Sequence, residues 1–433
     1  MYSSMAITLL LLLTLAVLAT STSRHSLEAA KTGFAVSLKH VDSGGNFTKL
    51  ELLQRRMKRG RKRMERLYAM ALASSDPSVS APVHAGNGEF LMEISIGTPP
   101  SSYSAIVDTG SDLIWTQCKP CKQCFTSPNP IFDPKKSSSF SNLPCSSRLC
   151  AALPLSSCSA DGSACEYLYT YGDYSSTQGV MATETFTFGK VSVPKVGFGC
   201  GLDNEGGGFN QGGGLVGLGR GPLSLVSQLD EPKFSYCLTS IDSTKQSKLI
   251  MGSLASVDAK DSIMTTPLLK NPSSPSFYYL NLQGITVGDT KLPIKESVFS
   301  IKGDGSGGMI IDSGTTITYL EGSAFEAVKK EFKRQVKLEV DESNETGLDL
   351  CFKVREGEEK VEVPKLVFHF EGADLDLPGE NYMIGDASGV ACLAMGGSSG
   401  MSIFGNVQQQ NMQVVHDLVK EAISFLPKQC DDL

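Results

Sequence analysis

IVDTGS (106–111) and IIDSGT (310–315) repeat one pattern: two apolar residues, an aspartate, a hydroxyl residue, a glycine and a second hydroxyl residue. An aspartate that directly follows an apolar strand is costly to bury. Two such aspartates, Asp108 and Asp312, stand in matching settings 204 residues apart. This repetition indicates a shared task for the two carboxylates rather than two unrelated turns.

The surroundings of the two motifs repeat as well. The strand-like stretch FLMEISIG (90–97) precedes the first motif, and FYYLNLQGITVG (277–288) precedes the second. An apolar–apolar–glycine triplet follows each motif, at 215–217 and at 403–405. Short strand patterns bounded by Gly, Pro and Ser dominate the rest of this region. We therefore predict a mostly β protein in which one unit is used twice, the copies being related by a pseudo-twofold axis.

Such an axis would bring the two aspartates together. At about 3 Å and an effective dielectric constant of about 20, two carboxylates repel each other by about 5 kcal/mol. Their ionisations then separate by several pKa units, so the pair holds one shared proton over an acidic range. One carboxylate can take a proton from water while its protonated partner donates to a carbonyl oxygen. This is general acid–base hydrolysis of an amide.

The neighbouring residues suit this role. Glycine leaves room for two loops to approach closely, and hydroxyl groups can bond across the axis or donate to the carboxylates. We expect close approach at Gly110 and Gly314, bonding across the axis from Thr109 and Ser313, and donation to the outer carboxylate oxygens from Ser111 and Thr315.

The N-terminal end carries a targeting pattern. Residues 6–18 form an uncharged apolar run of 13 residues, followed by small polar residues. This run is too short to span a bilayer and fits a signal peptide, which we place at residues 1–23. No other stretch approaches 18 apolar residues, so we expect a secreted protein without a membrane anchor.

Charge divides the remaining chain. Residues 24–77 hold 12 Lys and Arg against 5 Asp and Glu, a balance of +7, whereas the rest holds 27 against 41, a balance of −14. The basic run at 55–63 could bind nucleic acid, but a signal peptide argues against that partner. We predict a basic pro-segment over 24–77, helical from about Thr48 to Leu72, whose residues from Arg55 to Arg66 lie near an acidic cleft. Processing is expected near Ser74 to Pro82, with an N-terminal lobe at 78–253 and a C-terminal lobe at 254–433.

The twelve cysteines agree with secretion, since an even number in an oxidising compartment predicts disulfides. Cys118, Cys121 and Cys124 are spaced like metal ligands, but zinc would need a fourth ligand and reducing conditions, so we expect disulfides and no metal. Seven cysteines between 118 and 165 indicate a stapled insertion. Counting from the C-terminal end pairs Cys351 with Cys392 and Cys237 with Cys430. Asn46 and Asn344 are candidate glycosylation sites.

Taken together, these motifs resemble the pepsin-like aspartic proteases, and within them the plant nepenthesin type. By this resemblance Asp108 and Asp312 are the catalytic pair. Tyr171 and Gly172 belong to the flap over the substrate, and Trp115 supports Tyr171 by a hydrogen bond. Tyr174 departs from the family pattern, in which glycine is common there. The matching stretches are DTGSDLIW (108–115), YGDYSSTQG (171–179), FGCG (198–201), GLVGLGRGPLSL (214–225), KFSYCL (233–238), IIDSGTTITYL (310–320) and MSIFGNVQQQNM (401–412).

The resemblance carries further expectations. It implies a bilobal fold, polypeptide substrates, no cofactor, a monomer, and a location in the apoplast with the vacuole as the alternative. It also implies four disulfides in the first lobe: Cys118–Cys121, Cys124–Cys200, Cys145–Cys165 and Cys150–Cys158.

Three other interpretations compete with a protease. A secreted protein of this fold can be an inactive inhibitor or receptor, but both aspartate motifs and Tyr171 are intact here. The pattern G-x-G-x-x-G at 212–217 lies in a glycine run without an acidic residue about 20 positions later, which argues against dinucleotide binding. The pattern G-x-S-x-G at 396–400 is better explained by a turn between strands than by a serine hydrolase.

Overall fold

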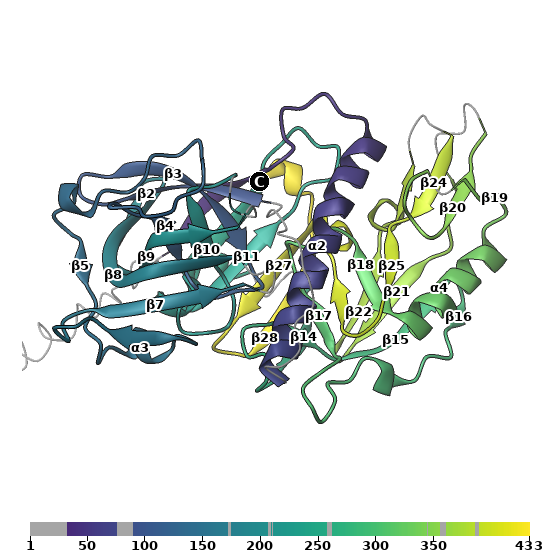
Figure 1. Cartoon of the computed structure of the whole chain (residues 1–433). Coiled ribbons are helices and arrows are strands. Elements are labelled where there is room, and N and C mark those ends of the chain that lie inside the picture. Colours follow the sequence, from purple (N-terminus) through teal and green to yellow (C-terminus); the bar gives the residue numbers. More distant parts are fainter. Residues whose placement is uncertain are drawn as a thin grey trace, which may run out of the picture. The chain divides into compact units, whose positions relative to one another are not determined.

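The computed structural model (Figure 1) describes residues 33–75, 90–171, 175–206, 209, 211–257, 262–343, 345–355, 361–385 and 389–433. The expected signal peptide, most of the expected processing region, Gly172, Tyr174 and Asn344 lie outside these residues. Residues 33–433 form one compact unit.

The repeat expected from the sequence is present in the strand pairing. In the first copy, β3 (Ser101–Asp108) lies between β2 (Phe90–Ile96), which is antiparallel, and β10 (Gly214–Gly217), which is parallel. In the second copy, β17 (Met309–Ile311) lies between antiparallel β14 (Tyr279–Leu280) and parallel β26 (Ser402–Phe404). The mostly β, two-lobed fold with pseudo-twofold related halves is therefore confirmed.

Strands from the two lobes also pair with each other. β11 (Lys233–Cys237) of the first half is antiparallel to β27 (Met412–Asp417) of the second, and each continues to a neighbour from its own half, β12 (Ser247–Gly252) and β28 (Ala422–Pro427). Backbone hydrogen bonds between β11 and β27 thus join the two lobes.

The expected pro-segment contributes a strand and a helix to this body. β1 (Gly33–His40) pairs with β12 and with the start of β2. α2 (Lys49–Ser75) begins at a reciprocal cap: the Thr48 backbone N–H donates to Glu51 (2.8 Å), and the Glu51 N–H donates to the Thr48 hydroxyl (3.2 Å). Leu53, Met57 and Leu67 of this helix are buried against the body. In Figure 1, α2 is the purple helix that crosses the middle of the body.

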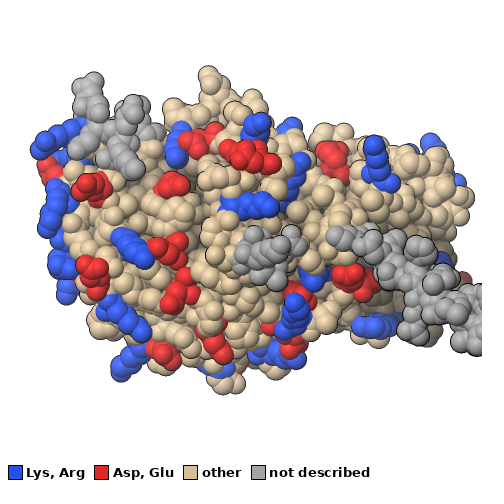
Figure 2. Space-filling view, turned by 180° about the vertical axis from the view of Figure 1, so that it is seen from behind, with Lys and Arg blue, Asp and Glu red and all other residues tan. Residues whose placement is uncertain are grey.

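The second long helix, α4 (Gly322–Gln335), follows β18 (Thr318–Glu321) and buries Phe325, Val328 and Phe332 on one face. Helical spacing of apolar residues predicts a helix from Ser323 to Lys337, and the observed bounds agree with this prediction within two residues. Seen from behind, the body carries interspersed basic and acidic side chains and no broad basic face (Figure 2).

The structure joins all twelve cysteines in six disulfides. The two pairs expected from counting, Cys237–Cys430 and Cys351–Cys392, occur. The four pairs expected in the first lobe are wrong. The observed pairs there are Cys118–Cys200, Cys121–Cys124, Cys145–Cys158 and Cys150–Cys165.

Strand pairing and burial explain these corrections. β4 (Trp115–Gln117) runs parallel to β9 (Val191–Glu205) with Thr116 opposite Cys200, which brings Cys118 to Cys200 and leaves Cys121 for Cys124. The short helix α3 (Arg148–Ala151) turns Cys150 inward, where it meets the equally buried Cys165. The two cysteines that lie nearer the surface, Cys145 and Cys158, then pair with each other.

Candidate active site

The repeated unit places one aspartate at the same point of each lobe. Asp108 is the last residue of β3, and Asp312 directly follows β17. The neighbouring parallel strand holds the backbone in both cases, since the Leu218 N–H donates to the Asp108 carbonyl (2.8 Å) and the Asp312 N–H donates to the Phe404 carbonyl (3.2 Å). Both side chains are buried, with 0% and 1% exposure.

Hydroxyl groups connect the two carboxylates as the motif predicts. The Thr109 hydroxyl donates across the axis to Oδ1 of Asp312 (2.8 Å) and lies 3.2 Å from the Ser313 hydroxyl. Each aspartate also accepts from the hydroxyl three residues later: Ser111 donates to Asp108 (2.5 Å) and Thr315 donates to Asp312 (2.6 Å). The two loops are thereby held in one rigid arrangement.

The two glycines of the motifs leave room for α2. A Cβ at Gly314 would lie 2.4 Å from the Arg63 guanidinium carbon, and one at Gly110 would lie 2.8 Å from a Leu67 methyl group. The sequence pattern predicts close approach of the two loops, and the structure adds the helix as a third partner.

Arg63 of α2 lies between the two aspartates and is 3% exposed. Its Nη2 donates to Asp108 Oδ1 (2.5 Å) and to Asp312 Oδ1 (2.6 Å), while its Nε donates to Asp312 Oδ2 (2.5 Å). A guanidinium is well suited to this task because its donors form a planar fork that matches carboxylates. One cation thus neutralises a pair of carboxylates that would otherwise repel each other.

The electrostatics of the pair follow from this contact. Burial alone would raise the pKa of Asp108, but the Arg63 and Arg66 guanidiniums hold that pKa far below its ordinary value. Burial likewise opposes ionisation of Asp312, and Arg63 outweighs it, so its pKa is also lowered. Arg63 itself resists deprotonation, because both carboxylates raise its pKa despite burial. With α2 in place, both aspartates are ionised.

Arg66 links the pair to Tyr171. Its Nη2 donates to Asp108 Oδ2 (2.9 Å), and its guanidinium lies over the ring of Tyr171 at 5.4 Å from the centroid. The indole N–H of Trp115 donates to the Tyr171 hydroxyl (2.7 Å), which is the bond expected from the family pattern. Tyr171 is 1% exposed in this arrangement.

Several polar residues around the pair are not predicted from the sequence. The Asp112 carboxylate accepts from the Gly221 N–H (2.9 Å) and from the Ser276 hydroxyl (2.5 Å), and burial raises its pKa. Asn406 donates to the Ser313 carbonyl (2.9 Å), and Gln409 donates to the Phe404 carbonyl (2.7 Å). Asn406 and Gln409 could have been predicted from their position inside the stretch 401–412, directly after the second apolar–apolar–glycine triplet.

Two fixed carboxylates with hydroxyl donors, from equivalent ends of a repeated unit, are the arrangement expected of an aspartic-type endopeptidase. Family models described as "Xylanase inhibitor N-terminal" and "Xylanase inhibitor C-terminal" match residues 90–253 and 277–427. The chain belongs to the plant pepsin-like aspartic proteases of the nepenthesin type.

Three curated relatives support this membership. Aspartic proteinase nepenthesin-1 from Nepenthes gracilis is 53% identical over 95% of this chain and 94% of its own length. Aspartic proteinase nepenthesin-2 from the same plant is 52% identical over 94% and 92%. Aspartyl protease family protein 2 from Arabidopsis thaliana is 38% identical over 92% and 86%.

Solved structures agree on the fold. The crystal structure titled edgp has a TM-score of 0.65 at 19% identity and covers 93% of this chain and 96% of its own. Basic 7S globulin from soybean has a TM-score of 0.61 at 21% identity, with coverage of 80% and 95%. At these identities the likeness extends to the fold alone.

Proposed function

We propose that this protein is a secreted, acid-active endopeptidase in which Asp108 and Asp312 hydrolyse peptide bonds through an activated water. The observation that supports it best is the pair itself: two buried aspartates from equivalent ends of a repeated unit, linked by Thr109 and supported by Ser111 and Thr315. Polypeptides are the substrates, consistent with relatives named aspartic proteinases.

The mechanism starts once α2 has left the site. Without Arg63, the two carboxylates share one proton at acidic pH, because two neighbouring buried carboxylates repel each other when both are ionised. The ionised carboxylate takes a proton from water, and the water oxygen attacks the carbonyl carbon of the peptide. The protonated partner donates its proton to the carbonyl oxygen, which gives a tetrahedral diol. The carboxyl group that took the proton from water then donates it to the amide nitrogen as the C–N bond breaks, and a hydroxyl proton of the diol passes to the other carboxylate, so the pair again holds one shared proton. Tyr171 covers the substrate from the flap side.

In the proposed zymogen, residues 24–77 form a pro-segment and α2 blocks the site. The basic residues expected near the cleft include Arg63 and Arg66, which contact both aspartates. The pKa values of the two aspartates are lowered while α2 is docked. The ion pairs therefore stabilise the docked helix above the ordinary carboxyl pKa of about 4, and this stabilisation is lost as pH falls through the lowered pKa values. Acidification therefore weakens the docked helix, and cleavage near Ser74 to Pro82 makes release permanent.

A signal peptide at 1–23 directs secretion, with the mature lobes at 78–253 and 254–433 and the protein acting as a monomer. Among the described residues, no helix is long and apolar enough to cross a membrane. Asn46 is exposed just before α2, where a glycan could be attached.

A digestion assay tests the proposal. Acid-processed protein is incubated with denatured haemoglobin at pH 3 to 5, with and without pepstatin. We expect digestion that pepstatin abolishes. Absence of digestion by correctly folded, processed protein would instead favour a binding protein of the same fold.

A further inference from the structure

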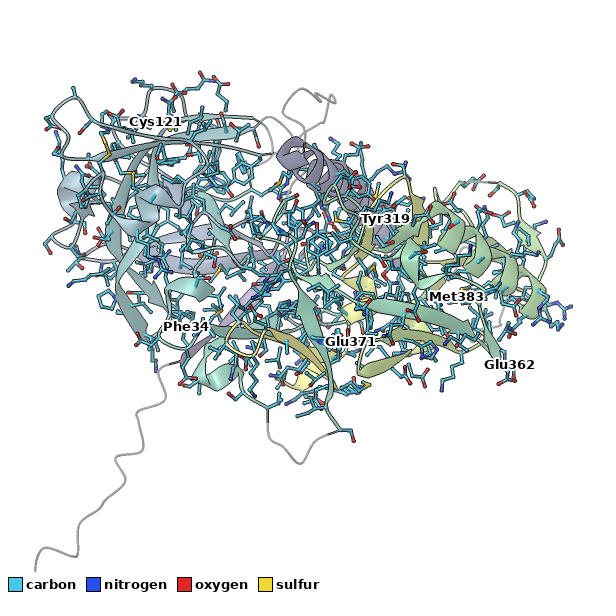
Figure 3. All side chains as sticks on the ribbon, turned by 90° about the horizontal axis from the view of Figure 1, so that it is seen from below. Phe34, Cys121, Tyr319, Glu362, Glu371 and Met383 are labelled. Carbon is cyan, nitrogen blue, oxygen red and sulfur yellow. A yellow bond between two sulfur atoms is a disulfide. The ribbon has the colours of Figure 1, made fainter. Side chains whose placement is uncertain are left out.

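A small sheet of the C-terminal half carries polar side chains that the aspartate site does not use. Its strands lie in the order β16 (Thr290–Lys291), β15 (Leu282–Val287), β21 (Leu366–Phe370) and β22 (Ala373–Leu377). One face packs into the core through the cross-strand row Ile285, Phe368 and Leu375. Glu371, at the turn between β21 and β22, lies well away from the purple helix α2 in Figure 3. This end of the sheet is therefore apart from the cleft.

Three side chains of the other face form a chain of short hydrogen bonds. The Thr286 hydroxyl oxygen lies 2.7 Å from His369 Nε2, and His369 Nδ1 lies 2.7 Å from Asp374 Oδ1. The strand register explains this arrangement, because His369 stands directly opposite Asp374 and one diagonal step from Thr286. A hydroxyl, an imidazole and a carboxylate thus follow one another across three neighbouring strands.

The position of the imidazole proton follows from these partners. An ionised carboxylate only accepts hydrogen bonds, so the proton of a neutral His369 ring is on Nδ1 and is donated to Asp374. Nε2 then accepts from the Thr286 hydroxyl. The His369 side chain is 24% exposed, so small molecules can reach it. This is the arrangement of a nucleophile, a general base and a group that orients the base.

A cation lies beside the hydroxyl. Lys291 is exposed and stands directly opposite Thr286 in the β15–β16 pair. Its side chain crosses over Gly284, since a Cβ there would lie 3.3 Å from Lys291 Cε and 4.0 Å from Lys291 Nζ. The same Cβ would lie 3.9 Å from His369 Cδ2, so the ammonium and the imidazole approach one point. An ammonium at this place can stabilise the oxyanion that forms when a hydroxyl attacks a carbonyl carbon.

We propose that this hydroxyl–imidazole–carboxylate chain, with Lys291 beside it, is a second active site that hydrolyses small activated carboxylic esters such as aryl acetates. The Thr286 oxygen attacks the ester carbon while His369 Nε2 takes the hydroxyl proton. The bond to the leaving oxygen then breaks, and the imidazolium gives its proton to that oxygen, which releases the alcohol and leaves an acyl-threonine. Water activated by the same imidazole hydrolyses the acyl-threonine to the carboxylic acid and restores the hydroxyl. This activity goes beyond the proposed peptidase and does not involve the aspartate pair.

Ester hydrolysis by the full-length proenzyme tests this site. Asp108→Asn proenzyme is used so that no self-digestion occurs, and p-nitrophenyl acetate is added at about pH 8, above the range in which histidines ordinarily titrate. We expect hydrolysis faster than in buffer and a transient acetyl group on Thr286, located by mass spectrometry after rapid acidification and peptide mapping. Acetyl groups on lysines alone, with none on Thr286, would overturn the proposal.

Four further variants in the same background assign the roles. Thr286→Val keeps the shape of the side chain, and we expect it and His369→Gln each to lower kcat/KM at least about tenfold, within the range of positioned acid–base catalysis. Asp374→Asn should lower kcat severalfold with KM unchanged, because this carboxylate positions the base and does not touch the ester. Thr187→Val, which removes a strand threonine whose hydroxyl bonds to Ser192, should keep the full rate. Equal rates in Thr286→Val and the background protein, at equal unfolding midpoints, would overturn the second site and leave the peptidase proposal unaffected.

Discussion

Arg63 is the residue that most changes how the site is understood. A buried cation is stable only when well paired, and Arg63 makes three short hydrogen bonds to two carboxylates. In the proposed mechanism the same two carboxylates need a shared proton. One side chain therefore keeps the site in a fully ionised state that cannot act as an acid.

Replacing Arg63 by glutamine should open the zymogen. The docked helix would then cover an Asp312 carboxylate without a cationic partner and an Asp108 carboxylate paired with Arg66 alone, which costs about 3–5 kcal/mol. We expect unprocessed Arg63→Gln protein to cleave a short peptide at about pH 6 at least tenfold faster than unprocessed wild type, with chain length checked by mass spectrometry. Lys58→Gln, a change at an exposed residue of the same helix, should stay latent; equal latency of both variants would contradict the role of Arg63.

His416 is a buried histidine whose protonation should affect stability in acid. Its ring is buried, stacks on Phe234 at 4.3 Å and meets Tyr278 edge-on. Burial lowers the pKa of His416 to about 3. Below about pH 6.5 the unfolded chain therefore binds a proton that the folded protein does not, so stability is lost as pH falls from about 6.5 to about 3.

Chemical denaturation across this pH range measures the effect. The folded protein should lose up to about 1.4 kcal/mol per pH unit through His416, and His416→Phe should remove that contribution. Asp108→Asn protein serves as the background, so that no self-digestion occurs. The same slope in wild type and His416→Phe would refute the assignment.

At the scale of elements, the sequence predicts the helices well because both are amphipathic and clearly bounded. α2 was expected from 48 to 72 and runs from 49 to 75, with its start fixed by the Thr48–Glu51 cap. The disulfides of the first lobe were mispredicted for a physical reason. Their partners depend on which strands pair and which way α3 turns Cys150, and neither is encoded in cysteine spacing.

Gly60 gives a test of how closely α2 docks. A Cβ at this position would lie 2.8 Å from the Thr316 hydroxyl oxygen and 3.0 Å from the Thr316 backbone nitrogen. Gly60→Val should push the helix outward and raise the peptidase activity of the unprocessed protein at about pH 6 severalfold. Lys58→Val, at an exposed position two residues earlier, adds the same side chain without the clash. Matching activity in both variants would show that the helix does not need this contact.

At the scale of the whole molecule, the repeat predicts the two-lobed fold, because each copy supplies the same strand–aspartate–strand unit. The meeting of Asp108 and Asp312, with Thr109 between them, follows from that symmetry. The position of Arg63 between the aspartates does not follow from the symmetry. It depends on where α2 lies along the cleft. That position is set by the packing of Leu53, Met57 and Leu67 against the assembled lobes.

The two-part organisation predicts how the zymogen matures. Wild-type proenzyme taken to pH 3 to 4 should shorten by cleavage near Ser74 to Pro82, as seen by mass spectrometry. Asp108→Asn proenzyme should stay full length, because its own site cannot cut. Equal shortening of both in purified samples would show that a different protease removes the segment.

The most direct measurement is the peptidase activity of the mature protein with each aspartate changed. Asp108→Asn and Asp312→Asn proteins are matured by an added protease and assayed on one pepstatin-sensitive peptide at acidic pH. Each change removes one of the two groups that move protons but no packing volume. We expect kcat/KM to fall by a factor of at least about 100 in both, with unfolding midpoints close to wild type. Retention of more than about 5% of the activity by either folded variant would contradict the assignment of the catalytic pair.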